Sequence, residues 1–364
     1  MAKKYIDSGK KDTRSGFGAG LYEAGKKDQR VVAMTADLIG SVKMDAFVKD
    51  FPERFVQCGI AEANMVGAAA GIALTGKVPF IGSFAEFVTG RVYDQIRQEV
   101  AYGHTNVKIA SSHAGITLGE DGATHQCNED IALMRAIPGM VVINPADDVE
   151  ARLCVMAAAE HEGPVYMRFG RLAVPVIFDE DYKFEIGKGV ELKEGNDVTI
   201  IATGLMVNEA LEAYELLKAE GINARIINMA TIKPLDNDIV LKAAKETGAI
   251  VTAEEHSVIG GLGSAVSELL SENYPVPVVK LGVNDTFGHS GPAPKLLDEF
   301  GLRAVNIVEK AKKANGFLEY ERKNGSEIPA CERIQNFEEF HGRLSLEEQQ
   351  KQAARCMDCG VPFC

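Results

Sequence analysis

The sequence has no apolar run that approaches the roughly 20 residues a helix needs to cross a bilayer. Its N-terminal stretch, MAKKYIDSGKKDTRSG, has no apolar segment behind the lysines and so lacks the pattern of a secretory signal. We therefore expect a cytoplasmic protein without a membrane span.

Basic residues are scarce relative to acidic ones. The 39 Lys and Arg are outnumbered by 52 Asp and Glu, which gives a formal net charge of −13. Nucleic-acid affinity depends on clustered Lys and Arg, so we expect no nucleic-acid partner, although single basic side chains can still hold a small anion. Hydrophobic residues at 46% and charged residues at 25% are typical of globular proteins and exclude wholesale disorder.

Short β-branched runs alternate with longer stretches at helical spacing, a pattern typical of parallel α/β sheets covered on both faces. The first set of expected strands is 31–36, 78–82, 107–110, 140–143 and 164–168, with helices at 62–75, 91–102, 128–136 and 147–160. The second set of strands is 198–203, 224–229, 249–254 and 275–282, with helices at 205–220, 235–247 and 261–272.

The chain of 364 residues exceeds the usual size of one domain. A charged, glycine-containing stretch at 176–197 interrupts the pattern and is interpreted as a linker with an extra hairpin. We therefore predict two parallel-sheet α/β domains and a mainly helical tail. The predicted boundaries are a first domain at 1–180, a linker at 181–197, a second domain at 198–314 and the tail at 315–364.

The loop SSHAGITLGEDGATHQ (111–126) follows a predicted strand and precedes a predicted helix. Ligands of open parallel sheets bind at the carboxyl ends of the strands, so this position alone makes the loop a candidate site. Its glycines could simply permit tight turns, and a single histidine would be solvated. Two histidines, His113 and His125, beside two acids favour a functional role.

Two further stretches attract attention. Glu62 opens an otherwise apolar, Gly- and Ala-rich helix. The helix dipole favours a carboxylate at this position, so a dipole or capping role is the simplest interpretation unless a basic nitrogen of a ligand approaches Glu62. Phe84 and Phe87 follow a predicted strand, where packing in the core is the default role of phenylalanine.

Several long motifs resemble those of transketolases, in the order and spacing of that family. QCGIAEANMVGAAAGIAL, GSFAEFVTGRVYDQIR and SSHAGITLGEDGATHQCNEDIALMRAIPGM resemble the pyrimidine-binding domain, above all in the C-terminal subunit of split, two-chain transketolases. EEHSVIGGLGSAVSELL and the region 198–314 resemble the transketolase C-terminal domain. The resemblance covers residues 5–314.

The resemblance implies roles for individual residues. Glu62 would face N1′ of the aminopyrimidine ring of thiamine diphosphate, with Phe84, Phe87 and Asp37 in the same cofactor pocket. His125 would act in catalysis and, with Asp121, hold the donor's hydroxyl and carbonyl oxygens. The positions that grip a sugar phosphate would be Arg14, Ser41, His113 and Arg171, with Arg168 as the alternative to Arg171.

The motifs that hold Mg²⁺ and the cofactor's diphosphate in this family are missing. No G-D-G run and no Asn-Asn pair occurs in the sequence. We therefore expect this chain to bind the cofactor poorly alone, to contribute no Mg²⁺ ligand, and to need an N-terminal transketolase subunit, with an α2β2 assembly and the active site between chains.

The tail differs in character from the rest. GFLEYER and QAARCMDCGVPFC resemble the N-terminus of the glutamate synthase small subunit, where cysteines lead into an iron–sulfur region. Three of the seven cysteines, Cys356, Cys359 and Cys364, are grouped here, and Cys331 is distant in sequence. Four thiolates normally hold one cluster, so the set favours a docking helix or fusion remnant over an iron–sulfur centre.

The function implied by these resemblances is transfer of a two-carbon ketol unit from a ketose phosphate to an aldose phosphate, as in the pentose phosphate pathway. A 1-deoxyxylulose-5-phosphate synthase and the β subunit of a 2-oxo acid dehydrogenase E1 enzyme are enzymatic alternatives. A regulatory or electron-transfer subunit acting through its cysteine tail is the non-enzymatic one.

Overall fold

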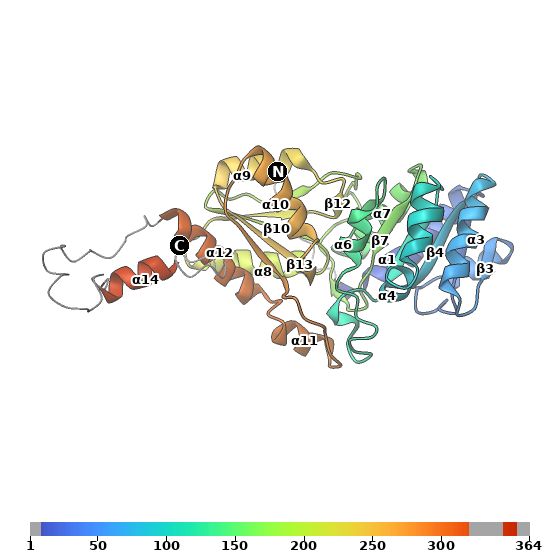
Figure 1. The fold of residues 1–364 in the computed structure, drawn as a ribbon, viewed down its shortest axis with the longest axis horizontal. Coiled ribbons are helices and arrows are strands. Elements are labelled where there is room, and N and C mark those ends of the chain that lie inside the picture. The colour runs from blue at the N-terminus through green and yellow to red at the C-terminus, as the bar shows by residue number, and fades with distance from the viewer. Residues whose placement is uncertain (1–8, 320–344, 355–364) are drawn as a thin grey trace, which may run out of the picture.

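The computed structural model describes residues 9–319 and 345–354 and contains two large sheets and one two-stranded sheet. Figure 1 shows the two large sheets beside each other along the long axis of the molecule. The first sheet has the strand order β12-β6-β7-β5-β4-β2-β3, and the second has the order β14-β13-β10-β11-β9. The prediction of two α/β units is confirmed.

The first sheet is parallel except for β12. Its strands are β2 (Val31–Thr35), β3 (Phe55–Gln57), β4 (Val78–Phe84), β5 (Lys108–Ser112), β6 (Val141–Ile143), β7 (Val165–Arg168) and β12 (Thr231–Lys233). Helices α1 (Thr13–Lys27) and α7 (Asp148–Glu160) share one hydrophobic core with one face of this sheet. Helices α3 (Glu62–Leu74) and α6 (Asp130–Ala136) and the π-helix η2 (Ile96–Tyr102) share another core with the opposite face.

The second sheet is built in the same way. Its strands are β9 (Val190–Lys193), β10 (Val198–Ala202), β11 (Ala224–Asn228), β13 (Ile250–Ser257) and β14 (Val278–Val283), and only β9 is antiparallel to its neighbour. Helices α8 (Met206–Ala219) and α12 (Ala304–Glu319) cover one face, and α9 (Asn237–Thr247) and α10 (Leu262–Asn273) cover the other. Strands buried on both faces explain the continuous apolar runs of the sequence.

Smaller elements complete the fold: β1 (Lys10–Lys11), α2 (Asp45–Asp50), η1 (Pro52–Arg54), α4 (Ala85–Val88), α5 (Tyr93–Gln95), η3 (Ile116–Leu118), β8 (Val174–Pro175), α11 (Ala293–Glu299) and α14 (Leu346–Ala354). Within the described residues, no helix combines the length and apolar character needed to span a membrane.

The extra hairpin expected within 176–197 does not form. β8 pairs with β1, whereas β9 joins the second sheet as the neighbour of β11. These strands find partners distant in sequence, so no local turn signal could reveal them.

The two sheets are joined by β12, which leaves the second half of the chain to pair with β6 of the first sheet. The Lys233 ammonium group extends this joint by donating to the carbonyl oxygens of Arg135 at 2.8 Å and Ile137 at 2.6 Å. The arrangement fixes the second sheet beside the loops that follow the strands of the first.

Candidate active site

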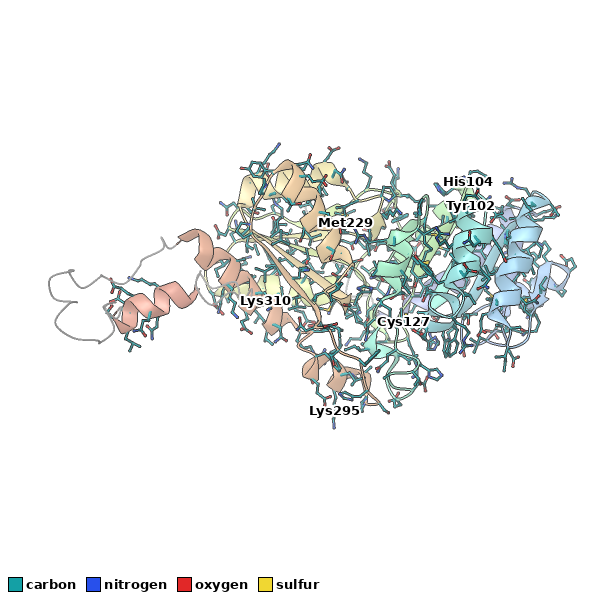
Figure 2. The ribbon with its side chains drawn as sticks, in the orientation of Figure 1. Tyr102, His104, Cys127, Met229, Lys295 and Lys310 are labelled. Atoms are coloured by element: carbon teal, nitrogen blue, oxygen red, sulfur yellow. The ribbon has the colours of Figure 1, made fainter. Side chains whose placement is uncertain are left out.

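The predicted site residues gather at the carboxyl edge of the first sheet. Asp37 follows β2, Phe84 ends β4 and His113 follows β5, and these three strands are adjacent and parallel. The loop from His113 to Asn128 lies beside the second sheet, and Figure 2 labels Cys127 near its end. This is the edge at which ligands of open parallel sheets bind.

Glu62 is the first residue of α3 and is only 4% exposed. Its Oε2 accepts a hydrogen bond from Nη1 of Arg91 at 3.1 Å, and no residue that the structure describes donates to Oε1. The carboxylate therefore lies at the N-terminus of α3 and is paired with one guanidinium. Arg91 is half-exposed and reaches Glu62 from the segment after α4. No sequence pattern predicted a role for this arginine.

Aromatic rings lie next to this carboxylate. Phe84 and Phe87 are stacked with ring centroids 5.8 Å apart, and the Arg91 guanidinium carbon is 4.1 Å from the Phe87 ring centroid. His113 lies 4.0 Å from Phe84 and His125 lies 5.2 Å from Phe87, again between ring centroids. The structure thus brings Glu62, two phenylalanines and both loop histidines to one place.

His113 is held as a neutral imidazole. Burial, and then the cations Arg14, Arg171 and Lys43, lower its pKa to about 3. Arg14 Nη1 lies 3.3 Å from Nε2, so Nε2 is the acceptor and the proton is on Nδ1, which donates to Ser112 Oγ at 2.7 Å. Both ring nitrogens are therefore engaged within the chain.

A cluster of cations surrounds His113. Arg14 donates to the carbonyl oxygen of Ser41 and pairs with Asp12, each at 3.1 Å. Arg171 donates to the carbonyl oxygen of Leu118 at 2.7 Å and keeps its side chain 42% exposed. Lys43 is the third cation, and sequence reasoning missed it although it lies two residues after Ser41.

Arg168, the alternative to Arg171, is placed differently. Its Nε pairs with Asp130 at 2.8 Å and its Nη2 donates to the carbonyl oxygen of Glu255 at 2.8 Å. The side chain is 4% exposed, so the guanidinium is buried and already paired. Between the two arginines, the geometry favours Arg171 for contact with a dissolved phosphate.

The remaining predicted residues are more open. Asp37 has a left-handed backbone with φ 60°, is exposed, and donates its backbone N–H to Gln57 Oε1 at 2.8 Å. Asp121 lies exposed in the turn of the loop. His125 is half-buried, with Nδ1 at 2.9 Å from Thr124 Oγ1, which leaves Nε2 available to a ligand.

One group of potential metal ligands is present among the described residues. Ligand atoms of Glu86, Cys127 and Glu129 lie within 4.8 Å of one another. Burial raises the pKa of the Cys127 thiol well above its usual value, and Sγ lies 3.6 Å from Thr89 Oγ1, within hydrogen-bonding distance. A protonated thiol with a hydroxyl partner is satisfied without a metal. Cys331, Cys356, Cys359 and Cys364 lie outside the described residues.

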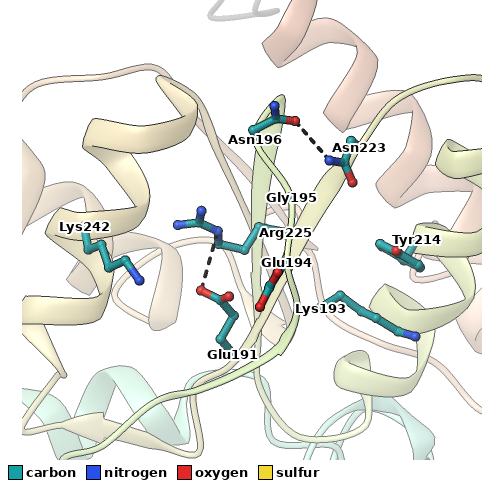
Figure 3. Close-up of a pocket in the computed structure, with 9 residues that line it drawn as sticks. All are labelled: Glu191, Lys193, Glu194, Gly195, Asn196, Tyr214, Asn223, Arg225 and Lys242. Carbon is teal, nitrogen blue, oxygen red and sulfur yellow. Dashed lines mark hydrogen bonds and ion pairs between the residues drawn. The ribbon is translucent and has the colours of Figure 1, made fainter. Parts of the chain in front are cut away.

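A wide cleft of about 850 Å³ lies elsewhere, in the second sheet (Figure 3). It opens at the amino ends of β10 and β11, where Asn196 and Asn223 precede the two strands. Arg225 lines it and is paired with Glu191 and Glu246. Because ligand sites of parallel sheets form at the opposite ends of strands, this cleft is not the candidate active site.

Comparison with known proteins identifies the class to which this arrangement belongs. Residues 9–176 match the family model "Transketolase, pyrimidine binding domain", and residues 187–307 match "Transketolase, C-terminal domain". The chain therefore combines the pyrimidine-binding domain and the C-terminal domain of transketolases, which are thiamine-dependent transferases.

Individual relatives show which transketolases this chain is similar to. The 6-deoxy-6-sulfo-D-fructose transketolase subunit SqwH of Clostridium sp. is 47% identical over 304 residues, which are 84% of this chain and 93% of that protein. A solved structure, "Split gene transketolase, inactive beta4 tetramer", is 52% identical with a TM-score of 0.79 and covers 84% of this chain and 98% of its own. Homo sapiens transketolase is 38% identical over 82% of this chain but only 48% of its own length. The chain belongs to the transketolase family.

Proposed function

We propose that this chain is the C-terminal subunit of a two-chain, thiamine diphosphate-dependent transketolase. It would transfer a two-carbon ketol unit from a ketose phosphate to an aldose phosphate. The observation that carries the proposal is Glu62, a buried carboxylate at a helix N-terminus with one oxygen unpaired among the described residues, beside the stacked rings of Phe84 and Phe87.

The residues present fit the pyrimidine ring of thiamine diphosphate. Phe84 and Phe87 offer a flat apolar wall, which stacks against a ring and excludes water. Glu62 Oε1 is available to share a proton with a ring nitrogen. When bound, the cofactor supplies a nucleophilic carbon that no side chain can provide.

The sugar would be held by residues of the 113–128 loop. His125 would offer Nε2 to the carbonyl oxygen of the donor, since Thr124 engages only Nδ1. Asp121, exposed in the same loop, is suited to accept hydrogen bonds from sugar hydroxyl groups.

The phosphate of the sugar would be held by Arg14, Lys43 and Arg171. Arginine offers a planar fork that matches phosphate geometry, and lysine adds a compact positive charge. His113 is neutral, so its contribution is to hold Arg14 Nη1 in place and to contact Phe84. Ser41 orients Arg14 through its carbonyl oxygen.

A second chain would complete the site. The absence of a G-D-G run and of an Asn-Asn pair from the sequence supports Mg²⁺ and diphosphate binding by an N-terminal partner. We further propose an α2β2 assembly in the cytoplasm, acting in pentose phosphate metabolism.

The tail stays a separate proposal. Residues 315–364 lie beyond the region matched by the family models and resemble the N-terminus of the glutamate synthase small subunit. Only three cysteines are grouped there, which supports a docking helix or fusion remnant without an iron–sulfur cluster. Iron and sulfide analysis of the aerobically and anaerobically purified chain would test this, and stoichiometric iron would reject it.

The proposed reaction is tested by mixing the chain with a candidate N-terminal partner, Mg²⁺ and thiamine diphosphate. Ketol transfer from xylulose 5-phosphate to ribose 5-phosphate is then assayed, with each chain alone as a control. Activity confined to the mixture is expected. A cofactor-loaded mixture that uses pyruvate, or another 2-oxo acid, in place of the ketose phosphate would reject the transketolase assignment.

A further inference from the structure

A carboxylate from the second sheet reaches into the candidate sugar-binding loop. Glu255, near the end of β13, accepts a hydrogen bond at Oε1 from the backbone N–H of Thr117 at 2.7 Å. The two residues are 138 positions apart in sequence. Glu255 belongs to the second sheet, whereas Thr117 lies in the loop that follows β5 of the first sheet. This bond connects the second sheet directly to the loop that carries Asp121 and His125.

The loop is shaped to receive this carboxylate. Gly115 has φ +76°, and a Cβ atom built on it would lie 2.3 Å from Oε1 and 2.8 Å from Oε2 of Glu255. Any larger residue would be strained in that conformation and would displace the carboxylate. Gly115 thus leaves the space that the Glu255 carboxylate occupies, and Thr117 donates the hydrogen bond to it.

Burial of this carboxyl group is costly and needs compensation. Glu255 is 3% exposed, and burial raises its pKa to about 7 although the Arg168 charge acts in the opposite direction. A buried polar group costs free energy unless it is hydrogen-bonded, and Thr117 supplies that bond. An apolar side chain could fill the same space without this cost but could not hold the Thr117 amide.

We propose that Glu255 is a positioning residue for the sugar substrate, which acts by fixing the loop of residues 113–128 through Gly115 and Thr117. It would not touch the substrate or the thiamine diphosphate. Its substrate role rests on the proposed function, whereas its hold on the loop is a property of this chain alone.

Glu254 provides a matched control. It is adjacent, equally buried, and its pKa is likewise raised to about 7 by burial. Its two oxygens, however, accept from the backbone N–H groups of Leu262 at 2.7 Å and Gly263 at 2.8 Å, at the start of α10. Loss of Glu254 should loosen α10 and leave the loop in place.

Hydrogen–deuterium exchange of the full chain separates the two carboxylates. We expect Glu255→Ala to accelerate exchange in the peptide containing Thr117 by about tenfold or more. Glu254→Ala should act instead on the start of α10. Unchanged exchange at Thr117 in a folded Glu255→Ala chain would overturn the inference, and so would equal effects of the two substitutions on the loop.

Kinetics of the assembled two-chain enzyme give the second readout. Glu255→Ala should lower kcat/KM for the sugar phosphate by about 10- to 100-fold, with thiamine diphosphate affinity unchanged. Glu255→Gln keeps an oxygen acceptor for Thr117 and should restore most of the loss, whereas Gly115→Ala should reproduce it from the loop side. An unchanged kcat/KM, or an equal loss of cofactor affinity, would overturn the substrate role.

The two experiments also distinguish this inference from the proposed function. Hydrogen exchange at Thr117 can be measured without enzymatic turnover. Its result therefore supports or overturns the contact between Glu255 and the loop whether or not the assembled enzyme is active. An inactive wild-type assembly would reject the proposed function instead.

Discussion

At the scale of single residues, Glu62 combines burial with an unpaired oxygen. Arg91 satisfies only Oε2, and the side chain is 4% exposed at the start of α3. An oxygen without a donor among the described residues can accept a hydrogen bond from a ligand, which a helix cap with both oxygens paired could not do.

The first prediction concerns this carboxylate. Glu62→Gln should lower kcat of the assembled enzyme by at least about 100-fold, because an amide cannot exchange a proton with a ring nitrogen. Ketol-transfer assays and circular dichroism would show the loss with an unchanged fold. Glu53→Gln, an exposed carboxylate in η1, is the control and should leave activity intact. Near-normal turnover of Glu62→Gln would remove Glu62 from the mechanism.

His125 carries the second prediction. His125→Ala should lower kcat/KM for the ketose donor by about 100-fold while thiamine diphosphate binding is retained, because Nε2, which Thr124 leaves available, is the atom that we propose contacts the donor sugar. Steady-state kinetics with varied donor would measure this. His104, exposed before β5 at the opposite edge of the sheet and labelled in Figure 2, offers the matched His→Ala control. An unaltered donor profile would contradict the role.

At the scale of elements, His256 joins β13 to α6. Its Nε2 accepts from the Ala132 backbone N–H at 3.3 Å, and its Nδ1 donates to the Ser257 carbonyl oxygen at 2.7 Å. Burial lowers the pKa of this histidine from 6.5 to about 4. Protonation of Nε2 would break the hydrogen bond from the Ala132 backbone N–H and place a positive charge in the buried contact between β13 and α6.

The third prediction is a pH dependence of stability. Since the pKa of His256 is lower in the folded than in the unfolded chain, its contribution is present above pH 6.5 and is lost as pH falls toward 4. The difference corresponds to about 3 kcal/mol of unfolding free energy. Urea unfolding between pH 4 and 7.5 should show a shallower acid loss for His256→Gln than for the wild type. Parallel pH profiles would contradict this.

Regular elements and tertiary contacts differ in how far the sequence predicts them. The apolar runs at 31–36 and 198–203 predicted β2 and β10, because strands buried on both faces are recognisable locally. β12 was missed, since its three residues become a strand only by pairing with distant β6. For the same reason Arg91 and Glu255, which act through contacts far along the chain, could not be found from local patterns.

At the scale of the whole molecule, the proposed function makes this chain one half of a cofactor site. Its carboxyl edge carries residues suited to a pyrimidine ring and a sugar phosphate, while the sequence lacks the family's diphosphate motifs. The chain also spans about half the length of Homo sapiens transketolase. The division of the site between two chains that we propose accounts for the residues at this edge and for the missing motifs.

The fourth prediction follows from this division. Isothermal titration of thiamine diphosphate, with Mg²⁺ present, into this chain, the N-terminal partner and their mixture measures whether cofactor binding needs both chains. We expect saturable binding in the mixture, at least about 100-fold tighter than in this chain alone, and loss of that binding when EDTA removes the metal. Equally tight binding by the isolated chain, or none in a mixture shown to be assembled, would contradict a cofactor site shared between two chains.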